Sequence, residues 1–382
     1  MKERRLEPKR RFKEFKNTSA WELHKLGDIT TEMVAGGDID KDLILDEGRY
    51  PVIANALTND GIVGYYNTDY RIEAPAVTVT GRGDVGHAKA RIADFTPVVR
   101  LLSIKSYHDV FFLENAINTL KIVIESTGVP QLTVPQLARY ELSFPKSLDE
   151  EEKIGSYFRN LDRLIALHQR KCDKLANVKK ALLEKMFPKK EKNIPEMRFK
   201  GFTDAWERRK LGEIATFING RAYAQDELLD EGKYKVLRVG NFYTNDSWYY
   251  SNMELGEKYY ANTDDLLYTW SASFGPHIWL GDKVIYHYHI WKVELSENFV
   301  KQFAVQILDY DKSKIMSDHN GSTMIHITKS GMENKIILLP SVEEQKKIGV
   351  LINSLDRLIT LHQRKLKKLQ NIKKAYLNEM FI

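Results

Sequence analysis

Two stretches of the chain carry apolar residues at alternating spacings of three and four, with charged residues between them. This spacing places the apolar side chains in one stripe and is typical of a helix that pairs with another helix. Acidic residues at the start of each stretch favour a helix N-terminus. We expect helices of about 37 residues, or about 55 Å each, within residues 147–188 and 341–382. Leu164 and Leu358 are expected to widen the stripe. The expected seam consists of Ile154, Phe158, Leu161, Ile165, His168, Leu175, Ile348, Ile352, Leu355, Ile359, His362, Leu366 and Leu369.

The remaining chain has a different pattern, with short runs of β-branched and aromatic residues separated by Gly, Asn and Asp. Examples are AVTVT from Ala76, KYKVLRV from Lys233 and VIYHYHIWKVEL from Val284. Such runs predict short strands bounded by turns. Residues 25–144 and 210–339 are therefore expected to form mixed domains in which β-structure dominates.

Both patterns occur twice because the chain is a tandem duplication. Residues 153–187 reappear as residues 347–381 without gaps, at a constant offset of 194. Upstream, RFKEFKNTSAWELHKLGDI from Arg11 is matched by RFKGFTDAWERRKLGEI from Arg198, and we call these two segments the entry motifs. The predicted organisation is a first entry motif and domain, a first helix, a second entry motif and domain, and a second helix, at residues 1–146, 147–188, 189–340 and 341–382.

The simplest partner for either long helix is its own duplicate. We therefore predict an α+β fold in which two tandem β-rich domains are each followed by a long helix. The helices are expected to pair as an antiparallel coiled coil with pseudo-twofold symmetry. His168 and His362 fall on the inner seam, where a buried ligand or a pH switch is conceivable. We favour a pair of polar residues that fixes the register of the helices.

One segment matches a nucleotide-binding sequence motif. TGRGDVGH from Thr80 contains the Gly-x-Gly-x-x-Gly pattern that binds dinucleotide phosphates between a strand and a helix. The matching segment of the duplicate, TWSASFGP from Thr269, has Trp270 in place of Gly81. Because backbone must approach the pyrophosphate closely at the first glycine, tryptophan is incompatible with that site. We expect a strand and a turn instead.

The chain lacks other catalytic motifs. It contains no GxxxxGK[ST], HExxH or GxSxG, and no amino-methyltransferase tetrapeptide. His287 and His289, with His277 nearby, could bind a metal, but no acidic or Cys ligands accompany them. We favour a polar strand face there, and we expect no catalytic residue, metal or cofactor in this chain.

Composition narrows the class of protein further. A net charge of +6 permits a polyanionic partner without requiring one. The only cysteine, Cys172, excludes a disulfide framework. No apolar run is long enough to span a membrane. A cytoplasmic protein with no membrane contact is expected.

Both duplicated segments resemble a known family. LPSVEEQKKIGVLINSLDRLITLHQRKLKKLQNIKKAYLNEMF, from Leu339, resembles the helical region of the specificity subunits of type I restriction-modification enzymes. FTDAWERRKLGEIA, from Phe202, resembles the entry motif of their target-recognition domains. Both occur twice in the order of the family, so the resemblance covers essentially the whole chain. The first entry motif departs from the second, with two additional residues and His24 in place of Arg209.

The resemblance implies a division of labour. Each target-recognition domain would read one half of a split, asymmetric sequence in double-stranded DNA, and the coiled coil would separate the two domains. The helices and entry motifs would dock two modification subunits, which carry S-adenosylmethionine and methylate adenine. Restriction subunits would add translocation and cleavage that depend on ATP and Mg. The family assigns no catalytic residue to the specificity subunit.

Polar and basic residues in loops that follow the Thr80 and Thr269 strands are the best candidates for DNA contacts, because side chains on loops can reach base edges and phosphates. The candidates in these loops are Arg82, His87, Lys89, Ser271, Ser273 and His277, and the further candidates are Arg71, Arg91, Arg238 and Asn241. Two other classes stay open. One is a helical scaffold or adaptor that binds only proteins, and the other is a standalone DNA-modifying enzyme with an unrecognised site.

Overall fold

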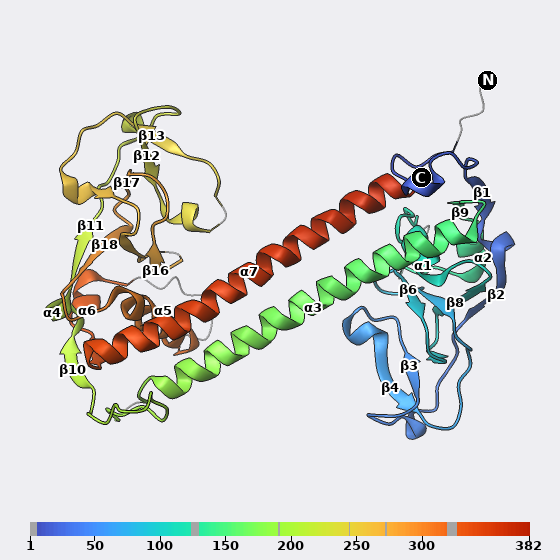
Figure 1. Cartoon of the computed structure of the whole chain (residues 1–382), viewed down its shortest axis with the longest axis horizontal. Helices are drawn as coiled ribbons and strands as arrows, with labels where there is room; N and C mark the ends of the chain where they lie inside the picture. The colour runs from blue at the N-terminus through green and yellow to red at the C-terminus, as the bar shows by residue number, and fades with distance from the viewer. Residues whose placement is uncertain (1–5, 124–129, 190–191, 244, 272, 319–326) are drawn as a thin grey trace. The chain divides into compact units, whose positions relative to one another are not determined.

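The computed structural model describes all residues except 1–5, 124–129, 190–191, 244, 272 and 319–326. The chain forms two compact units (Figure 1). Unit 1 comprises residues 1–170 and 362–382, and unit 2 comprises residues 171–361. Each unit therefore contains one β-rich domain and one part of each long helix.

Within the described residues of unit 1, a four-stranded antiparallel sheet has the order β2-β8-β5-β6. A three-stranded sheet has the order β4-β3-β7, and β1 pairs with β9. The strands are β1 (Glu22–Lys25), β2 (Thr30–Ala35), β3 (Tyr50–Ile53), β4 (Ile62–Tyr66), β5 (Ala76–Thr80), β6 (Ala88–Arg91), β7 (Thr96–Pro97), β8 (Leu101–Ser106) and β9 (Glu141–Phe144). The short helices are α1 (Val110–Asn118) and α2 (Val134–Ala138).

Unit 2 repeats this construction in its described residues. One sheet has the order β11-β18-β15-β16, a second has the order β13-β12-β17-β14, and β10 pairs with β19. The strands are β10 (Glu207–Lys210), β11 (Ala215–Asn219), β12 (Tyr234–Leu237), β13 (Tyr249–Ser251), β14 (Tyr260–Ala261), β15 (Leu266–Thr269), β16 (Gly275–Ile278), β17 (Val284–Tyr286), β18 (Ile290–Leu295) and β19 (Ile336–Leu339). The short helices are α4 (Leu211–Ile214), α5 (Lys301–Asp318) and α6 (Lys329–Glu333).

The main sheets of the two units match strand by strand, whereas the second sheet has three strands in unit 1 and four in unit 2. β2-β8-β5-β6 corresponds to β11-β18-β15-β16, and the pair β1-β9 corresponds to β10-β19. The prediction of a duplicated, β-dominated fold is therefore confirmed at the level of topology.

The long helices are α3 (Leu148–Met186) and α7 (Val342–Met380), each 39 residues long. Their antiparallel pairing is confirmed within unit 1, where His168 contacts His362 and the earlier residue Asp162 accepts hydrogen bonds from the later residue Lys373. In unit 2 the duplicate of that ion pair joins Lys179 Nζ to Asp356 at 2.7 Å. The same sequence pair therefore fixes the register of the helices once in each unit.

The core of unit 1 contains the C-terminal end of α7. Phe381 packs against Phe112 of α1 and Trp21 of the first entry motif, with ring centroids 5.2 and 6.4 Å away. Ile154 and Phe158 of α3 join the same core. Residues from both chain ends therefore build one hydrophobic cluster.

Unit 2 uses the duplicates of these residues. Phe187, at the end of α3, packs against Phe303 of α5 and Trp206 of the second entry motif, with ring centroids 5.6 and 6.0 Å away. Ile348 and Ile352 of α7 complete this core. The end of each long helix thus packs against the domain of the other repeat.

The entry motifs hold the first turns of the long helices. Arg11 donates two hydrogen bonds to the carboxylate of Glu150 in α3, at 2.8 and 2.6 Å. Arg198 donates two to Glu344 in α7, at 2.9 and 2.7 Å. Both carboxylates are buried, so these bidentate ion pairs connect entry motif and helix in each repeat.

All thirteen predicted seam residues are buried or half-buried, including Leu175, Leu366 and Leu369. The expectation for Leu164 and Leu358 was wrong, because they are 42% and 44% exposed. A pair of helices covers only the narrow seam between them, so residues beside that seam stay in contact with solvent.

Candidate nucleic-acid interface

Arg82 lies on the turn between β5 and β6. Thr80 closes this turn, because its N–H donates to the His87 carbonyl at 3.0 Å. Gly83 and Gly86 have φ of +76° and +92°, which few residues other than glycine adopt. The Arg82 side chain is exposed and has no hydrogen-bond or ion-pair partner in the described part of the chain. The segment is a hairpin with an accessible guanidinium, and the antiparallel strand β6 follows where a nucleotide site requires a helix.

Three other predicted residues of unit 1 line a common pocket of about 410 Å³. His87, Lys89 and Arg91 come from β6 and the turn before it. Asn115 of α1 and Lys373 of α7 line the same pocket. Neutral hydrogen-bond donors and cations therefore converge on a cavity beside the Arg82 turn.

Arg91 is a half-buried cation of this pocket. Its Nε donates to the Thr78 hydroxyl at 2.9 Å and its Nη1 donates to the Asp60 carbonyl at 2.8 Å. Burial lowers the pKa of Arg91. Lys89 lies 3.6 Å from the Asp60 carboxylate, and both of these side chains are largely exposed. Because the half-buried guanidinium bonds only to uncharged oxygens, a phosphate oxygen nearby would stabilise it.

Arg71 is not part of this group. It is exposed and its Nη2 donates to the Asp38 carbonyl at 2.5 Å, and it does not line the pocket.

In unit 2, His277 is enclosed by aromatic rings. It stacks on Phe242 with centroids 4.1 Å apart, and its Nε2 lies 3.3 Å from the hydroxyls of Tyr243 and Thr269. Burial, together with the charge of Lys312, lowers the pKa of His277 to about 4. His277 is therefore a neutral hydrogen-bonding group at pH 7, suited to a base edge and unsuited to a phosphate.

Arg238 and Asn241 shape the loop after β12. The Asn241 side chain accepts from the Arg238 N–H at 3.0 Å and donates to the carbonyls of Asn245 and Ser247. Its amide is therefore occupied by the loop itself. The Arg238 guanidinium lies over the Tyr249 ring at 4.2 Å. The Arg238 Nε is buried and has no hydrogen-bond partner in the described residues, whereas the Asn241 amide has a structural role in the loop.

The counterpart of the Arg82 turn follows β15. Trp270 takes the position of Gly81, stacks on Trp291 at 5.8 Å and donates its indole N–H to the Tyr288 carbonyl at 2.9 Å. Ser271 is 9% exposed, whereas Ser273 is exposed. The two repeats thus offer different chemistry at one topological position, a guanidinium in unit 1 and an aromatic surface with a serine in unit 2.

The sequence analysis missed several residues that the fold brings to these sites. Asn115 and Asn118 line the pocket of unit 1 although they belong to an apolar helix. The sequence did contain a signal for these two residues, because two amides three positions apart lie on one face of a helix and mark that face as polar. Lys373 carried no such signal, since only tertiary structure brings the end of α7 beside β6.

The histidines of the HYH segment are also placed by the fold. Burial, followed by the charges of His289 and Arg238, lowers the pKa of His287 to about 4. Among the described residues, no three His, Cys, Asp or Glu side chains group closely enough to hold a metal ion. No helix in the described ranges is long and apolar enough to cross a bilayer.

The family model for the type I restriction modification DNA specificity domain matches residues 18–177 and 203–371. These two matches cover both repeats and most of the chain. The chain belongs to the type I restriction-modification DNA specificity family.

Individual relatives agree with this assignment. The type I restriction enzyme MjaVIII specificity subunit of Methanocaldococcus jannaschii is 22% identical, over 94% of this chain and 91% of that protein. The crystal structure of a type I S subunit from M. genitalium matches 99% of both chains with a TM-score of 0.73 and 16% identity. A chain from a structure of type I system assembly matches with a TM-score of 0.51, over 94% of this chain and 97% of that one. The fold is therefore the fold of this specificity family.

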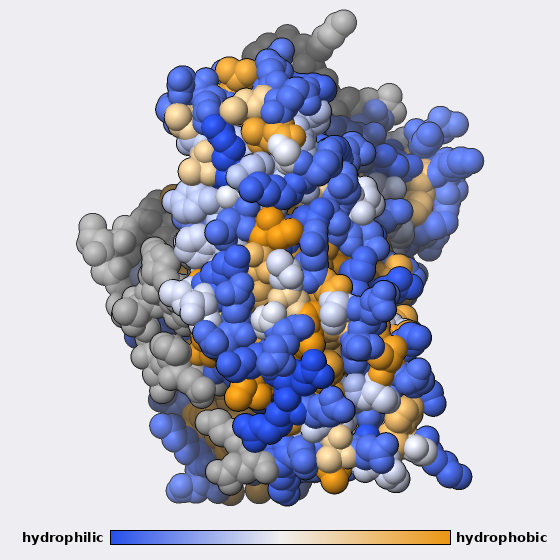
Figure 2. Space-filling view, turned by 90° about the vertical axis from the view of Figure 1, so that its left-hand side faces the viewer, coloured by the Kyte–Doolittle hydropathy of each residue, from blue (hydrophilic) through white to orange (hydrophobic). Residues whose placement is uncertain are grey.

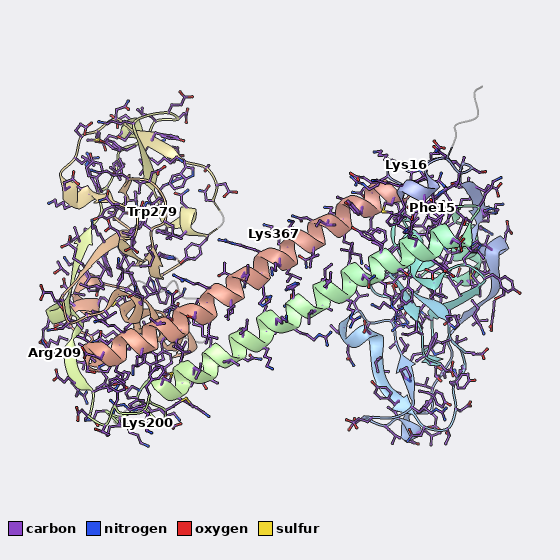
Figure 3. All side chains as sticks on the ribbon, in the orientation of Figure 1. Phe15, Lys16, Lys200, Arg209, Trp279 and Lys367 are labelled. Atoms are coloured by element: carbon purple, nitrogen blue, oxygen red, sulfur yellow. The ribbon has the colours of Figure 1, made fainter. Side chains whose placement is uncertain are left out.

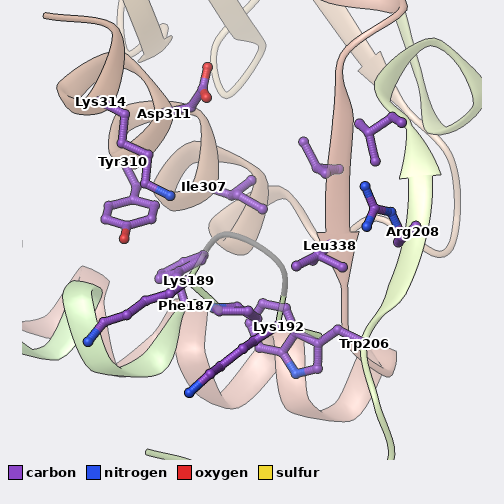
Figure 4. Close-up of a pocket in the computed structure, with 13 residues that line it drawn as sticks. Phe187, Lys189, Lys192, Trp206, Arg208, Ile307, Tyr310, Asp311, Lys314 and Leu338 are labelled. Atoms are coloured by element: carbon purple, nitrogen blue, oxygen red, sulfur yellow. The ribbon is translucent and has the colours of Figure 1, made fainter. Parts of the chain in front are cut away.

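The second repeat of this specificity-family chain has a pocket of about 420 Å³ at its entry motif (Figure 4). Phe187, Trp206 and Tyr310 form its apolar wall, and Lys192 and Arg208 add positive charge. The Trp206 indole nitrogen is buried and has no hydrogen-bond partner in the structure described. The pocket combines aromatic surface with cations.

Other apolar groups of unit 2 reach the solvent. Figure 2 shows a mostly polar face with apolar side chains at the surface in its middle. Ile336, which lines the pocket, is 53% exposed, and Val350 of α7 is 63% exposed. Exposed apolar groups beside an aromatic pocket are typical of a protein-docking surface.

Proposed function

We propose that this chain is the DNA specificity subunit of a type I restriction-modification complex and reads a bipartite, asymmetric duplex target. The observation that carries the proposal is the duplicated hairpin: β5-β6 and β15-β16 occupy the same place in matching sheets, yet Arg82 stands on one turn and Trp270 begins the other. Two similar scaffolds with different side chains would read two different half-sites. Lys and Arg contacts to phosphates would add affinity that does not depend on sequence.

The chemistry belongs to partner subunits in this proposal. Two modification subunits would bind S-adenosylmethionine and methylate adenine, and restriction subunits would use ATP and Mg for translocation and cleavage. We assign the docking of one modification subunit in part to the pocket lined by Phe187 and Trp206. The complex would act in the cytoplasm, where it meets DNA.

The test compares the chain alone, the modification subunits alone and the two together, each with duplex DNA and S-adenosylmethionine. We expect methyl transfer only from the mixture, and methylome sequencing of cells with and without the gene should return one split motif. Methylation by this chain alone would identify a standalone enzyme. Assembly with proteins but no DNA binding by the complex would identify an adaptor.

Arg82 provides a test at single-residue resolution. If its guanidinium pairs with a guanine, Arg82→Ala should weaken binding of the complex to the cognate duplex by about 1 to 3 kcal/mol. Fluorescence anisotropy at fixed salt measures this change, with Arg49→Ala as the control because Arg49 is also exposed in unit 1 and is not one of the candidate DNA contacts. Unchanged cognate affinity removes Arg82 from the interface.

We also propose that the paired helices act as a ruler and set the unread spacer between the half-sites. Duplicating residues 169–175 in α3 and 363–369 in α7 adds one heptad to each helix, or about 10 Å. Methylation mapping should then return a longer spacer or no methylation. Recovery of the original spacer would rule out the ruler.

A further inference from the structure

The part of α7 that belongs to unit 1 is densely basic. Residues 362–374 contain six Lys or Arg and no Asp or Glu, although the whole chain carries a net charge of only +6. Lys373 is neutralised by Asp162 through hydrogen bonds of 2.6 and 2.8 Å. The other five cations are exposed. This segment therefore concentrates positive charge, whereas acidic residues offset the positive charge in the rest of the chain.

Three of these cations share one face of the helix, and we call them the α7 basic face: Arg364, Lys367 and Lys368. They line a shallow hollow of about 480 Å³, and Figure 3 marks Lys367 on this stretch of α7. None of the three has a hydrogen-bond or ion-pair partner in the described part of the chain. Cations three and four positions apart repel one another and destabilise a helix, so a bound anion would relieve a cost.

The first repeat differs at this face. The counterpart of Lys367 in α3 is Asp173, whereas the counterparts of Arg364 and Lys368 are the cations Arg170 and Lys174. An acid therefore interrupts the basic face in α3, and the uninterrupted set of three cations is specific to α7.

The three cations surround a floor that is mostly apolar. Ile372, Ala375 and Tyr376 supply this floor, so the charge of the surrounding side chains is what favours a polyanion. Tyr376, the largest side chain of the floor, already stacks on Tyr157 with centroids 5.5 Å apart and has the Arg10 guanidinium 4.5 Å from its ring. From Arg364 to Lys374 the helix rises about 15 Å, a length over which duplex DNA presents about nine phosphate charges.

We propose that the α7 basic face binds the phosphate backbone of duplex DNA without regard to sequence. The proposal rests on the proposed function, since it adds a contact outside the recognition domains to a chain that binds DNA. The helix α7 would then contribute directly to the affinity for DNA, in addition to connecting the two recognition domains.

The test replaces Arg364, Lys367 and Lys368 with Gln and measures DNA binding by the full chain assembled with its modification subunits. The probes are a duplex with the split motif found by methylome sequencing and a scrambled duplex of equal length. Each lost phosphate contact lowers the slope of log K against log salt by about 0.9, so the slope should fall by about 2 to 3. Affinity for both duplexes should fall together, leaving their ratio unchanged.

The matched control replaces Lys41, Lys121 and Arg139 with Gln. These cations are exposed in unit 1, outside the entry motif and the long helices, and the change in net charge is the same. An equal fall in slope for both variants would reduce the effect to net charge and overturn the proposal, as would an unchanged slope in the α7 variant. Loss of co-purifying modification subunits with an unchanged slope would make the face a protein dock instead. If the unaltered complex does not discriminate between the two duplexes, the proposed function fails independently.

Discussion

At the scale of residues, the two entry motifs repeat one interaction. Arg11 and Arg198 each donate two hydrogen bonds to a buried glutamate in the first turn of a long helix. Acidic first turns were interpreted from the sequence as favourable to the helix dipole. The fold adds a stronger reason for Glu150 and Glu344, because each carboxylate is the counter-ion of an arginine with little solvent access.

Glu150→Gln should therefore destabilise unit 1 by about 3 kcal/mol, since it leaves the Arg11 guanidinium buried beside a neutral amide. Hydrogen exchange of the strands of unit 1 measures the change without assuming two-state unfolding of the whole chain. The control is Glu152→Gln, because Glu152 lies in the same turn and is exposed. Equal protection in the two variants would contradict this role for the ion pair.

At the scale of elements, the long helices are joined by polar contacts as well as by apolar packing. His168 and His362 meet with their Nδ1 atoms 2.8 Å apart, which requires one nitrogen to donate and the other to accept. They are duplicates of each other, as are the pairs Asp162–Lys373 and Lys179–Asp356. Polar residues at defined seam positions stabilise one alignment of the two helices over others. This agrees with the register role favoured for the histidines.

A double-mutant cycle tests the histidine contact. His168→Leu removes the partner of His362 Nδ1 and should cost about 1 kcal/mol, and the reciprocal His362→Leu should cost the same. The variant with both changes should be less destabilised than the sum, because two leucines pack without an unmet polar group. Hydrogen exchange in α3 and α7 provides the readout, and strictly additive effects would argue against the bond.

At the scale of the whole molecule, each compact unit is assembled from both repeats. Phe381 is the second-to-last residue of the chain, yet it packs on Trp21 and Phe112 in unit 1. Its duplicate Phe187 packs on Trp206 in unit 2. Unit 1 therefore requires the C-terminal end of α7, which belongs to the second repeat.

Phe381→Ala should destabilise unit 1 by about 3 to 5 kcal/mol, the usual cost of emptying a buried aromatic position. Hydrogen exchange should increase in β8 and α1 and stay unchanged in β18 and α5. Phe187→Ala is the matched variant and should produce the opposite pattern. Loss of protection in unit 2 of the Phe381→Ala variant, or in unit 1 of the Phe187→Ala variant, would contradict the packing of each helix end on the domain of the other repeat.

The duplication, the two long helices, their seam and the β-dominated domains followed from the sequence alone, because periodicity and internal repeats are local properties of a chain. The rejection of a nucleotide site at Gly81 also followed, since its own duplicate holds Trp270. Tertiary structure decided which helix end completes which core and which candidates stay accessible. Arg82 remains exposed, Asn241 is used by its own loop, and His277 is enclosed by rings. Those outcomes depend on contacts between residues far apart in the chain, which a local pattern does not specify.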